Sequence, residues 1–496
     1  MVLIKDVKER QLKNTGQYVL LVVTTYFFPL LTLPFFTRVL VPEDYGVLAM
    51  SGMFGMFLTS FSNLGLVGIY QRNYFQYRDD RTKIATLFYT TICFVSAFFI
   101  LLWGLSFVFQ DVVSMFLYQR KGMGKVFLID GLGTFLTGLS QYYFYYFQNS
   151  ENAKSYVRYS LMVMVLTTGA SLLLVLYFRT GVMGMVYGKF IGVGSILILL
   201  HAKFLRELPF AWDKDILKAS LKLSLPLVPN TFSKIFMKQF DKYMINILST
   251  LGQVGIYNMG DKIAYTAFAF MTALDQVYVP HIYKEMFKGE EGGGKTIGKY
   301  LTPFFYCSLF FCFVVAVFAE EIIILLTPPA YYGAINIVMI LSMAYALMFF
   351  GKQSQLLYAG KMKLLAVLLI LNVLMNVGFN FMLIHRFGAI GAAASALAAG
   401  LIFTPIYMFF CQKHFRIEWE QAKIFILLGF FFSSVCSLLF VRSHISYLAV
   451  LAVKVILLVS YIYIGFVFEI ITKNRIRFVR HVIVGKIKSF VKTRKY

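Results

Sequence analysis

The feature that most constrains the fold of this chain is a succession of long apolar stretches separated by short polar ones. A membrane-spanning helix needs about 20 mostly apolar residues. The stretches reach this length without strict alternation of apolar and polar residues, which predicts helices and not the strands of a barrel. We therefore predict an all-α integral membrane protein with about fourteen transmembrane helices, at 14–37, 45–70, 83–109, 125–148, 155–178, 182–204, 220–248, 254–279, 299–318, 333–358, 363–385, 388–412, 420–440 and 447–470.

Composition leads to the same class. Hydrophobic residues make up 59% of the chain and charged residues only 14%, whereas roughly a quarter of the residues of a soluble domain are charged. The N-terminal "MVLIKDVKERQLKNTG" lacks the cleavage site of a signal peptide and runs directly into the first apolar stretch. The cysteines show neither zinc-ligand nor disulfide spacing, so we interpret them as small apolar core residues: Cys93, Cys307, Cys312, Cys411 and Cys436.

The net charge of +24 is distributed as expected for a membrane protein and not for a nucleic-acid-binding one. Most lysines and arginines fall in alternate loops and near the two ends of the chain, the pattern that sets orientation in a membrane. It predicts that both termini are cytoplasmic, with 472–496 as a basic tail on anionic lipid headgroups. The longest outer loops, 110–124 and 319–332, are too short for a catalytic domain, and no phosphate-binding loop is present. We therefore expect no enzyme and no catalytic or metal-binding residue.

An internal repeat indicates two related halves. The segments "YFRTGVMGMVYG" at 177–188 and "IHRFGAIGAAAS" at 384–395 share an arginine and two glycines. The same number of residues separates the two members of each matched pair. At a slightly longer spacing, "EDYGVL" at 43–48 matches "GQVGIY" at 252–257, which aligns Gly46 with Gly255. One such match can be chance, because glycine is common after helix ends, but several in order indicate duplication. We predict an N-lobe of six helices at 1–210, a C-lobe of six at 211–415 and two extra helices at 416–471, a parallel repeat around a central cavity as in transporters that rock two halves.

Polar residues inside the predicted spans are the candidate site, because ionisable groups are costly in the membrane and usually line a path. One helical face of 220–248 carries several of them, and 125–148 carries a second polar stripe. The predicted substrate-binding residues are Arg38, Lys189, Lys234, Lys238, Lys262, Gln141 and Asn230. The predicted ion-coupling residues are Asp130, Asp241 and Asp261, with H⁺ or Na⁺ as the ion and no other cofactor.

Other roles for these residues stay open. Lys234 with Asp241, or Asp261 with a neighbouring lysine, can be structural ion pairs, and Arg38 or Lys454 can reach the membrane surface by snorkelling. The predominance of cations favours an anionic substrate such as a phosphate or diphosphate. The aromatic run "QYYFYYF" at 141–147 suits either stacking on sugars or an interfacial belt, and we favour the belt.

The chain resembles the Wzx-type polysaccharide flippases of the multidrug/oligosaccharidyl-lipid/polysaccharide (MOP) exporter superfamily. The resemblance is carried by "LPFFTRVLVPEDYGVLAM" at 33–50, by "DKYMINILSTLGQVGIYNMGDKI" at 241–263 and by the two RxGxxG turns. It implies a bacterial inner-membrane protein that moves undecaprenyl-diphosphate-linked oligosaccharide by alternating access for surface polysaccharide biosynthesis. It also implies a polymerase and glycosyltransferases as partners, and a lipid-tail groove at 420–470.

Two other functions remain as alternatives. A multidrug exporter of the same superfamily usually takes cationic substrates, so it should carry a cavity rich in carboxylates. A membrane polymerase or ligase of the same pathway should carry a substantial outer loop.

Overall fold

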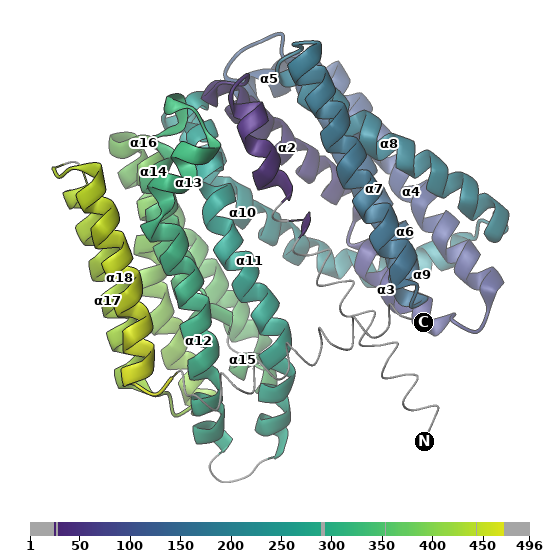
Figure 1. The fold of residues 1–496 in the computed structure, drawn as a ribbon. Coiled ribbons are helices and arrows are strands. Elements are labelled where there is room, and N and C mark those ends of the chain that lie inside the picture. Colours follow the sequence, from purple (N-terminus) through teal and green to yellow (C-terminus); the bar gives the residue numbers. More distant parts are fainter. Residues whose placement is uncertain (1–23, 26–27, 289–292, 353, 443, 471–496) are drawn as a thin grey trace, which may run out of the picture. The chain divides into compact units, whose positions relative to one another are not determined.

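The computed structural model describes residues 24–25, 28–288, 293–352, 354–442 and 444–470. Every regular element within these ranges is a helix (Figure 1), which confirms the predicted fold class. Among the described helices, eight are long and apolar enough to cross a membrane, and two shorter apolar helices, Phe28–Thr37 and Ala334–Leu347, accompany them. The count of fourteen spans stays a prediction, and the basic tail at 472–496 lies outside the described residues.

The helices are linked by short turns. In chain order, after Phe28–Thr37, they are α2 (Pro42–Asn63), α3 (Leu66–Gln76), α4 (Arg81–Val108), α5 (Gln110–Tyr118), α6 (Gly124–Asn149), α7 (Ala153–Leu172), η1 (Leu173–Tyr177), α8 (Val182–Glu207), α9 (Lys214–Ser224), η2 (Leu225–Leu227), α10 (Val228–Leu248), α11 (Leu251–Lys288), α12 (Gly293–Val317), α13 (Ala319–Leu326), η3 (Pro329–Tyr331), α14 (Ala334–Leu347), η4 (Phe350–Lys352), α15 (Gln355–Tyr358), α16 (Met362–His414), α17 (Gln421–Val441) and α18 (Tyr447–Val467).

These helices form two compact groups of residues. Unit 1 comprises the described residues within Met1–Met259, Ile324–Gly333 and Asn380–Ala392. Unit 2 comprises the described residues within Gly260–Ile323, Ala334–Phe379 and Ala393–Tyr496. The lobe boundaries expected from the repeat, at 210 and 415, remain a prediction.

Several predicted spans are interrupted helices in the structure. The span 45–70 is divided into α2 and α3, because Leu64 and Gly65 both adopt positive φ angles, 47° and 76°. The span 220–248 is divided by η2, where Pro226 removes a backbone donor and produces a single tight turn. The outer loops at 110–124 and 319–332 contain the short helices α5 and α13, which the hydropathy pattern does not reveal.

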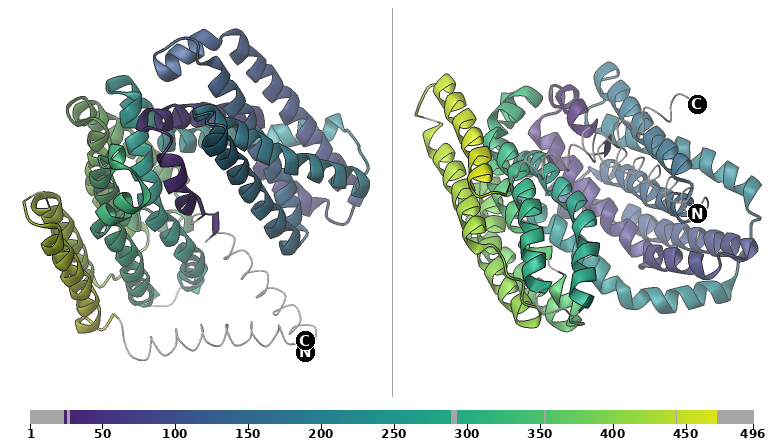
Figure 2. Two further views of the ribbon diagram at one scale, coloured as in Figure 1. Left: turned by 45° about the horizontal axis from the view of Figure 1, so that its top comes forward. Right: turned by 60° about the horizontal axis from the view of Figure 1, so that its bottom comes forward.

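Aromatic side chains fill the core of unit 1, around α4, α6 and α8. Tyr142 and Tyr143 are fully buried, and Phe147 is 2% exposed. Phe88 of α4 stacks on Phe204 of α8 at a centroid distance of 5.0 Å. The run at 141–147 therefore contributes mainly to packing, and the expectation of an interfacial belt was wrong for its buried members. Neighbouring helices such as α7 and α8 lie side by side in this unit (Figures 1 and 2).

The two RxGxxG turns have the same backbone conformation. Gly181 has φ 60° and ψ −137°, and Gly388 has φ 57° and ψ −133°, a region that is essentially open only to glycine. The second glycine of each turn permits close packing: a Cβ at Gly184 would lie 3.1 Å from the Val175 nitrogen, and one at Gly391 would lie 2.2 Å from the Leu383 oxygen. The sequence repeat thus corresponds to a repeat of local structure.

A second repeated pair, Gly46 and Gly255, lies where the first turns of α2 and α11 cross within unit 1. A Cβ at Gly46 would lie 1.9 Å from the Leu251 oxygen, and a Cβ at Gly255 would lie 1.8 Å from the Pro42 oxygen. Gly46 therefore packs on the backbone of Leu251, four residues before Gly255. Gly255 packs on the backbone of Pro42, four residues before Gly46. The contact is reciprocal, as in an interface with two-fold symmetry.

Candidate functional site

The clearest polar centre of unit 1 is an ion pair between α6 and α8. Lys189 Nζ donates to Asp130 Oδ1 at 2.7 Å and to Thr134 Oγ1 at 2.7 Å. Thr134 in turn donates to the Asp130 carbonyl at 2.8 Å, which leaves its lone pairs to accept from the lysine. The lysine side chain is 27% exposed and the aspartate side chain 6%. The structure therefore joins a predicted substrate ligand to a predicted ion-coupling group.

Glycines on the facing helices make room for this pair. A Cβ at Gly133 would lie 3.1 Å from Lys189 Cε, so the lysine stem runs directly over that position. A Cβ at Gly55 of α2 would lie 2.7 Å from Thr134 Oγ1. Small residues allow the helices to approach closely and bury the carboxylate against its cation.

Asp241 belongs to another polar group in unit 1. Its carboxylate accepts from the Tyr257 hydroxyl at 3.1 Å and from Asn380 Nδ2 at 2.7 Å. The donors come from α11 and α16, so three helices meet at this carboxylate. Asp261, in unit 2, accepts from the Tyr345 hydroxyl of α14 at 2.5 Å.

Lys454 occupies a buried ion cluster in unit 2. It is 2% exposed, and its Nζ lies 2.9 Å from Glu320 Oε2 and 2.7 Å from Glu321 Oε1. The interpretation that Lys454 snorkels to the membrane surface was wrong. It links α18 to the first turn of α13.

The other predicted residues are more dispersed. Arg38 lies in the turn after Phe28–Thr37 and is exposed, as are Lys238 and Lys262, and Gln141 is half-buried on α6. Asn230 and Lys234 lie on α10, and their side chains are outside the described part of the structure. Of the predicted substrate ligands, Lys189 is the one whose described contacts define a built site.

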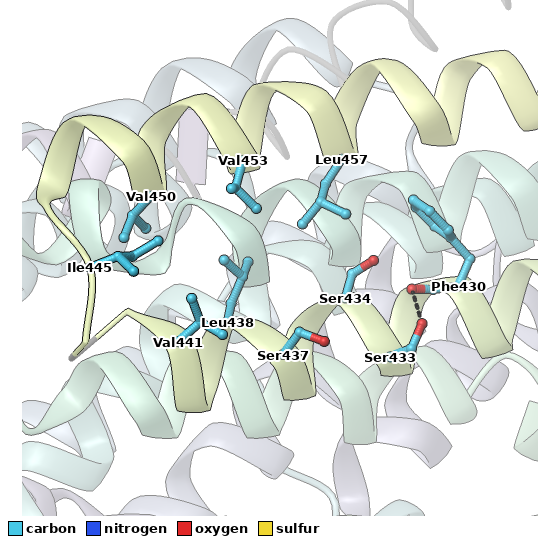
Figure 3. Close-up of a pocket in the computed structure, with 10 residues that line it drawn as sticks. All are labelled: Phe430, Ser433, Ser434, Ser437, Leu438, Val441, Ile445, Val450, Val453 and Leu457. Atoms are coloured by element: carbon cyan, nitrogen blue, oxygen red, sulfur yellow. Dashed lines mark hydrogen bonds between the residues drawn. The ribbon is translucent and has the colours of Figure 1, made fainter.

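A cavity of about 230 Å³ lies between α17 and α18, which run side by side (Figures 1 to 3). Its wall is apolar apart from serines on α17, one of which, Ser433, donates to the Phe430 carbonyl at 3.1 Å. None of the predicted site residues lines it. The lining comprises Phe430, Ser433, Ser434, Ser437, Leu438, Val441, Ile445, Val450, Val453 and Leu457.

Most partners of these charged groups cannot be predicted from the sequence pattern. Tyr257, Tyr345 and Asn380 supply neutral donors to the aspartates, and Glu320 and Glu321 supply the counter-charges of Lys454. A polar residue such as Asn380 within an apolar span is a usable signal, but tyrosine is too common in this chain to be one. The cysteines are also more varied than expected: Cys312 and Cys411 are buried, Cys93 is intermediate, and Cys307 and Cys436 are exposed.

The fold is shared with solved structures of a flippase and of multidrug transporters. The chain superposes on "Lipid II flippase MurJ, inward closed conformation" with a TM-score of 0.64 and 13% identity, over 92% of this chain and 99% of that one. The Vibrio cholerae MATE transporter VcmN superposes with a TM-score of 0.55 and 13% identity, over 84% of this chain and 98% of that one. An inward-facing multidrug resistance MATE family transporter of the MOP superfamily superposes with a TM-score of 0.52 and 15% identity, over 78% of this chain and 94% of that one. At these identities the likeness establishes the fold.

Sequence comparison establishes the family. No curated protein matches the chain in sequence. The family model described as "Polysaccharide biosynthesis protein" matches residues 35–286, just over half of the 496 residues. Membership of a polysaccharide biosynthesis family is thereby confirmed: the chain is a multi-pass membrane protein with the fold of these solved transporters, and it belongs to the polysaccharide biosynthesis protein family.

Proposed function

We propose that the protein is a flippase that carries undecaprenyl-diphosphate-linked oligosaccharide across the bacterial inner membrane by alternating access. The observation that supports this most directly is Lys189, a partly exposed cation held within helices of the MOP fold. Lysine donors bind phosphate oxygens through charge-assisted hydrogen bonds, which suits a diphosphate headgroup. Membership of a polysaccharide biosynthesis family supports a glycan as part of the proposed substrate.

In this proposal the other predicted cations of unit 1 assist the same headgroup. Arg38 and Lys238 are exposed, and Lys234 is spaced four residues from Lys238 on α10. Lys262, exposed in unit 2, stays a predicted substrate ligand. Gln141 and Asn230 would provide hydrogen bonds to sugar hydroxyls. The lipid tail would stay in the bilayer, with part of it in the apolar cavity between α17 and α18 (Figure 3).

We further propose that an ion gradient drives the cycle through Asp130, Asp241 or Asp261, since carboxylates within spanning helices can exchange a proton or hold a cation. Both termini would be cytoplasmic, as the distribution of basic residues predicts. Glycosyltransferases would act before this step, and a polymerase would act after it. The protein itself would transport and not catalyse.

The test is transport in proteoliposomes that carry polyprenyl-diphosphate oligosaccharide in one leaflet. The wild type should expose the glycan on the opposite side, and Lys234→Ala/Lys238→Ala should reduce the rate at least tenfold, the equivalent of losing about one charge-assisted hydrogen bond. Lys218→Ala, which removes an exposed lysine of α9, is the matched control and should transport normally.

Two outcomes would overturn parts of this proposal. Equal transport by the double variant and the wild type would mean that these lysines are structural. A wild type that moves no lipid-linked glycan, with or without an ion gradient, but exports organic cations would favour the multidrug exporters that share the fold.

A further inference from the structure

The short helix α9 of unit 1 (Figure 1) carries a basic face that the proposed function does not use. Its three lysines, Lys214, Lys218 and Lys222, are spaced four residues apart, so they form one row on the helix surface. All three are exposed. We call them the lysine row. Neighbouring members are separated by about 6 Å along the helix axis.

The lysine row is not neutralised by acidic side chains. Other lysines near the ends of the neighbouring helices have partners: Lys83 Nζ lies 3.7 Å from Asp80 Oδ2, and Lys203 Nζ lies 3.7 Å from Glu207 Oε1. Within the described residues the row itself makes no ion pair. Asp213, just before α9, accepts from the first backbone N–H groups of the helix and caps it. The positive charge of the row is therefore open to an external anion.

The segment that leads into α9 lies beside the interior of a spanning helix. The backbone nitrogen of Asp213 donates to Thr90 Oγ1 of α4 at 3.0 Å, and the ring of Phe210 lies 5.1 Å from that of Tyr89. Since α4 begins at Arg81, these contacts are about 13 Å along its axis. The helix α4 is among those long and apolar enough to cross a membrane. The start of α9 therefore lies within the depth of the membrane and not in the solution beyond it.

Large apolar side chains are exposed on both sides of the lysine row. Phe210 and Trp212 precede α9, and Leu223 and Leu225 follow the row. Tryptophan is enriched where hydrocarbon meets lipid headgroups. The opposite face of α9 is occupied, because Ser220 is buried against α3. The open side of α9 thus combines cations with apolar groups, as in helices that lie in the membrane interface.

We propose that the lysine row of α9 binds the headgroups of anionic phospholipids such as phosphatidylglycerol, with Phe210 and Trp212 against the adjoining acyl chains. Lysine ammonium groups donate charge-assisted hydrogen bonds to phosphate oxygens, and two neighbours in the row can bind one phosphate from both sides. The headgroup of phosphatidylcholine carries a cation of its own, which the row repels. The row therefore selects lipids with a net negative charge.

This contact attaches the connection between α8 and α10 to the lipid surface. Asn73 Nδ2 of α3 donates to Ser220 Oγ at 3.3 Å, and α9 continues through η2 into α10. The proposed substrate ligands do not include the row. Lys218→Ala leaves two of its three cations and should therefore still transport the glycan.

The experiment is quenching of Trp212 fluorescence by brominated lipids. The chain has three tryptophans, so Trp103→Phe/Trp419→Phe leaves Trp212 as the single reporter. The full-length protein is placed in phosphatidylcholine bilayers with equal proportions of brominated phosphatidylglycerol or brominated phosphatidylcholine. The anionic lipid should bind near Trp212 with an affinity roughly fivefold or more higher, and this preference should fall as salt is added.

Trp212→Phe in the otherwise unchanged chain gives a second measurement that leaves Trp103 and Trp419 in place. The quenching that distinguishes the anionic from the zwitterionic lipid should disappear in this variant. This arm assigns the signal to the start of α9 even if the double tryptophan variant folds poorly.

A change of charge on α9 tests the row directly. Lys214→Gln/Lys218→Gln/Lys222→Gln should abolish the preference for the anionic lipid. Quenching by brominated phosphatidylcholine should persist, because Trp212 still lies in the bilayer.

The matched control removes the same number of exposed lysines from α7 and from the start of α16. Lys154→Gln/Lys361→Gln/Lys363→Gln should keep the full preference for the anionic lipid. A local effect of α9 is thereby separated from the net charge of the protein.

The inference is overturned if the two brominated lipids quench Trp212 equally, if neither quenches it, or if the triple variant of the row keeps its preference. Loss of the preference in excess inorganic phosphate at constant ionic strength would assign the row to free phosphate and would overturn it as well. None of these results bears on the proposed function, which is tested by transport of the lipid-linked glycan.

Discussion

Gly46 and Gly255 occupy equivalent positions of the internal repeat and pack against each other's helices at one crossing. The crossing needs glycine on both sides, because a Cβ at either position would overlap a backbone oxygen at less than 2 Å. The two copies of the repeated segment thus contact each other where α2 and α11 begin. An alternating-access cycle that separates α2 from α11 would have to break this contact.

Substitution at this crossing should destabilise the protein. Gly255→Ala places a methyl group 1.8 Å from the Pro42 oxygen, and we expect a loss of about 1–3 kcal/mol in the free energy of unfolding. Gly46→Ala should have a similar effect, and the double variant should lose less than the sum, because one displacement of α2 relieves both overlaps. Unfolding in detergent, followed by tryptophan fluorescence, measures all three.

The matched control is Gly104→Ala on α4, where no heavy atom lies within 4 Å of the added Cβ. It should be neutral or stabilising, because alanine favours a helix by about 1 kcal/mol over glycine. Additive losses at positions 46 and 255 would show that the two sites do not share one displacement.

Removal of Lys454 alone should lower the free energy of unfolding, whereas removal of the whole ion cluster should change it much less. Lys454→Met leaves Glu320 and Glu321 together without their cation, and we expect a loss of roughly 3–5 kcal/mol. Lys454→Met with Glu320→Gln and Glu321→Gln should recover most of that loss. If the single variant is as stable as the wild type in the same unfolding measurement, the cluster does not hold α18 to α13.

A side chain added at the first glycine of either RxGxxG turn should destabilise the protein. Gly388→Ala and Gly181→Ala would place alanine at φ values near 60° and ψ values near −135°, at a cost of about 1–3 kcal/mol each. Gly169→Ala on α7, which faces open space, is the control and should cost nothing. Equal melting temperatures for all three variants would contradict the conformational argument.

The cap of α4 should give a pH-dependent contribution to stability. Asp80 accepts a hydrogen bond from the Lys83 backbone nitrogen at 3.0 Å, and this bond lowers the pKa of the carboxyl below its ordinary value of 3.8. The stabilisation is therefore fully present above the ordinary pKa and is lost as the pH falls through the lower pKa of the folded state. Asp80→Ala should be less stable than the wild type at pH 7, and the difference should shrink below pH 3.8. A difference that is the same at every pH would contradict the assignment.

The sequence predicts the helices well because the bilayer dictates their length and their apolar character. It also identifies Lys189 and Asp130 as candidates, since any charge within a span is conspicuous. It does not predict that they pair, because pairing depends on how α6 and α8 face each other. A glycine that allows two helices to approach cannot be distinguished in the sequence from a glycine that does not. The partners of Lys454 were missed for a similar reason: Glu320 and Glu321 lie in a segment that reads as an outer loop, and only the packed structure brings them to α18.

The backbone of the two RxGxxG turns has a consequence for comparing the two halves of this chain. Gly181 and Gly388 share one conformation, φ near 60° and ψ near −135°, which suits glycine and disfavours every other residue. An alignment of one half with the other should therefore keep Gly181 opposite Gly388, because any other register would match one of these turns with a segment that does not adopt its conformation.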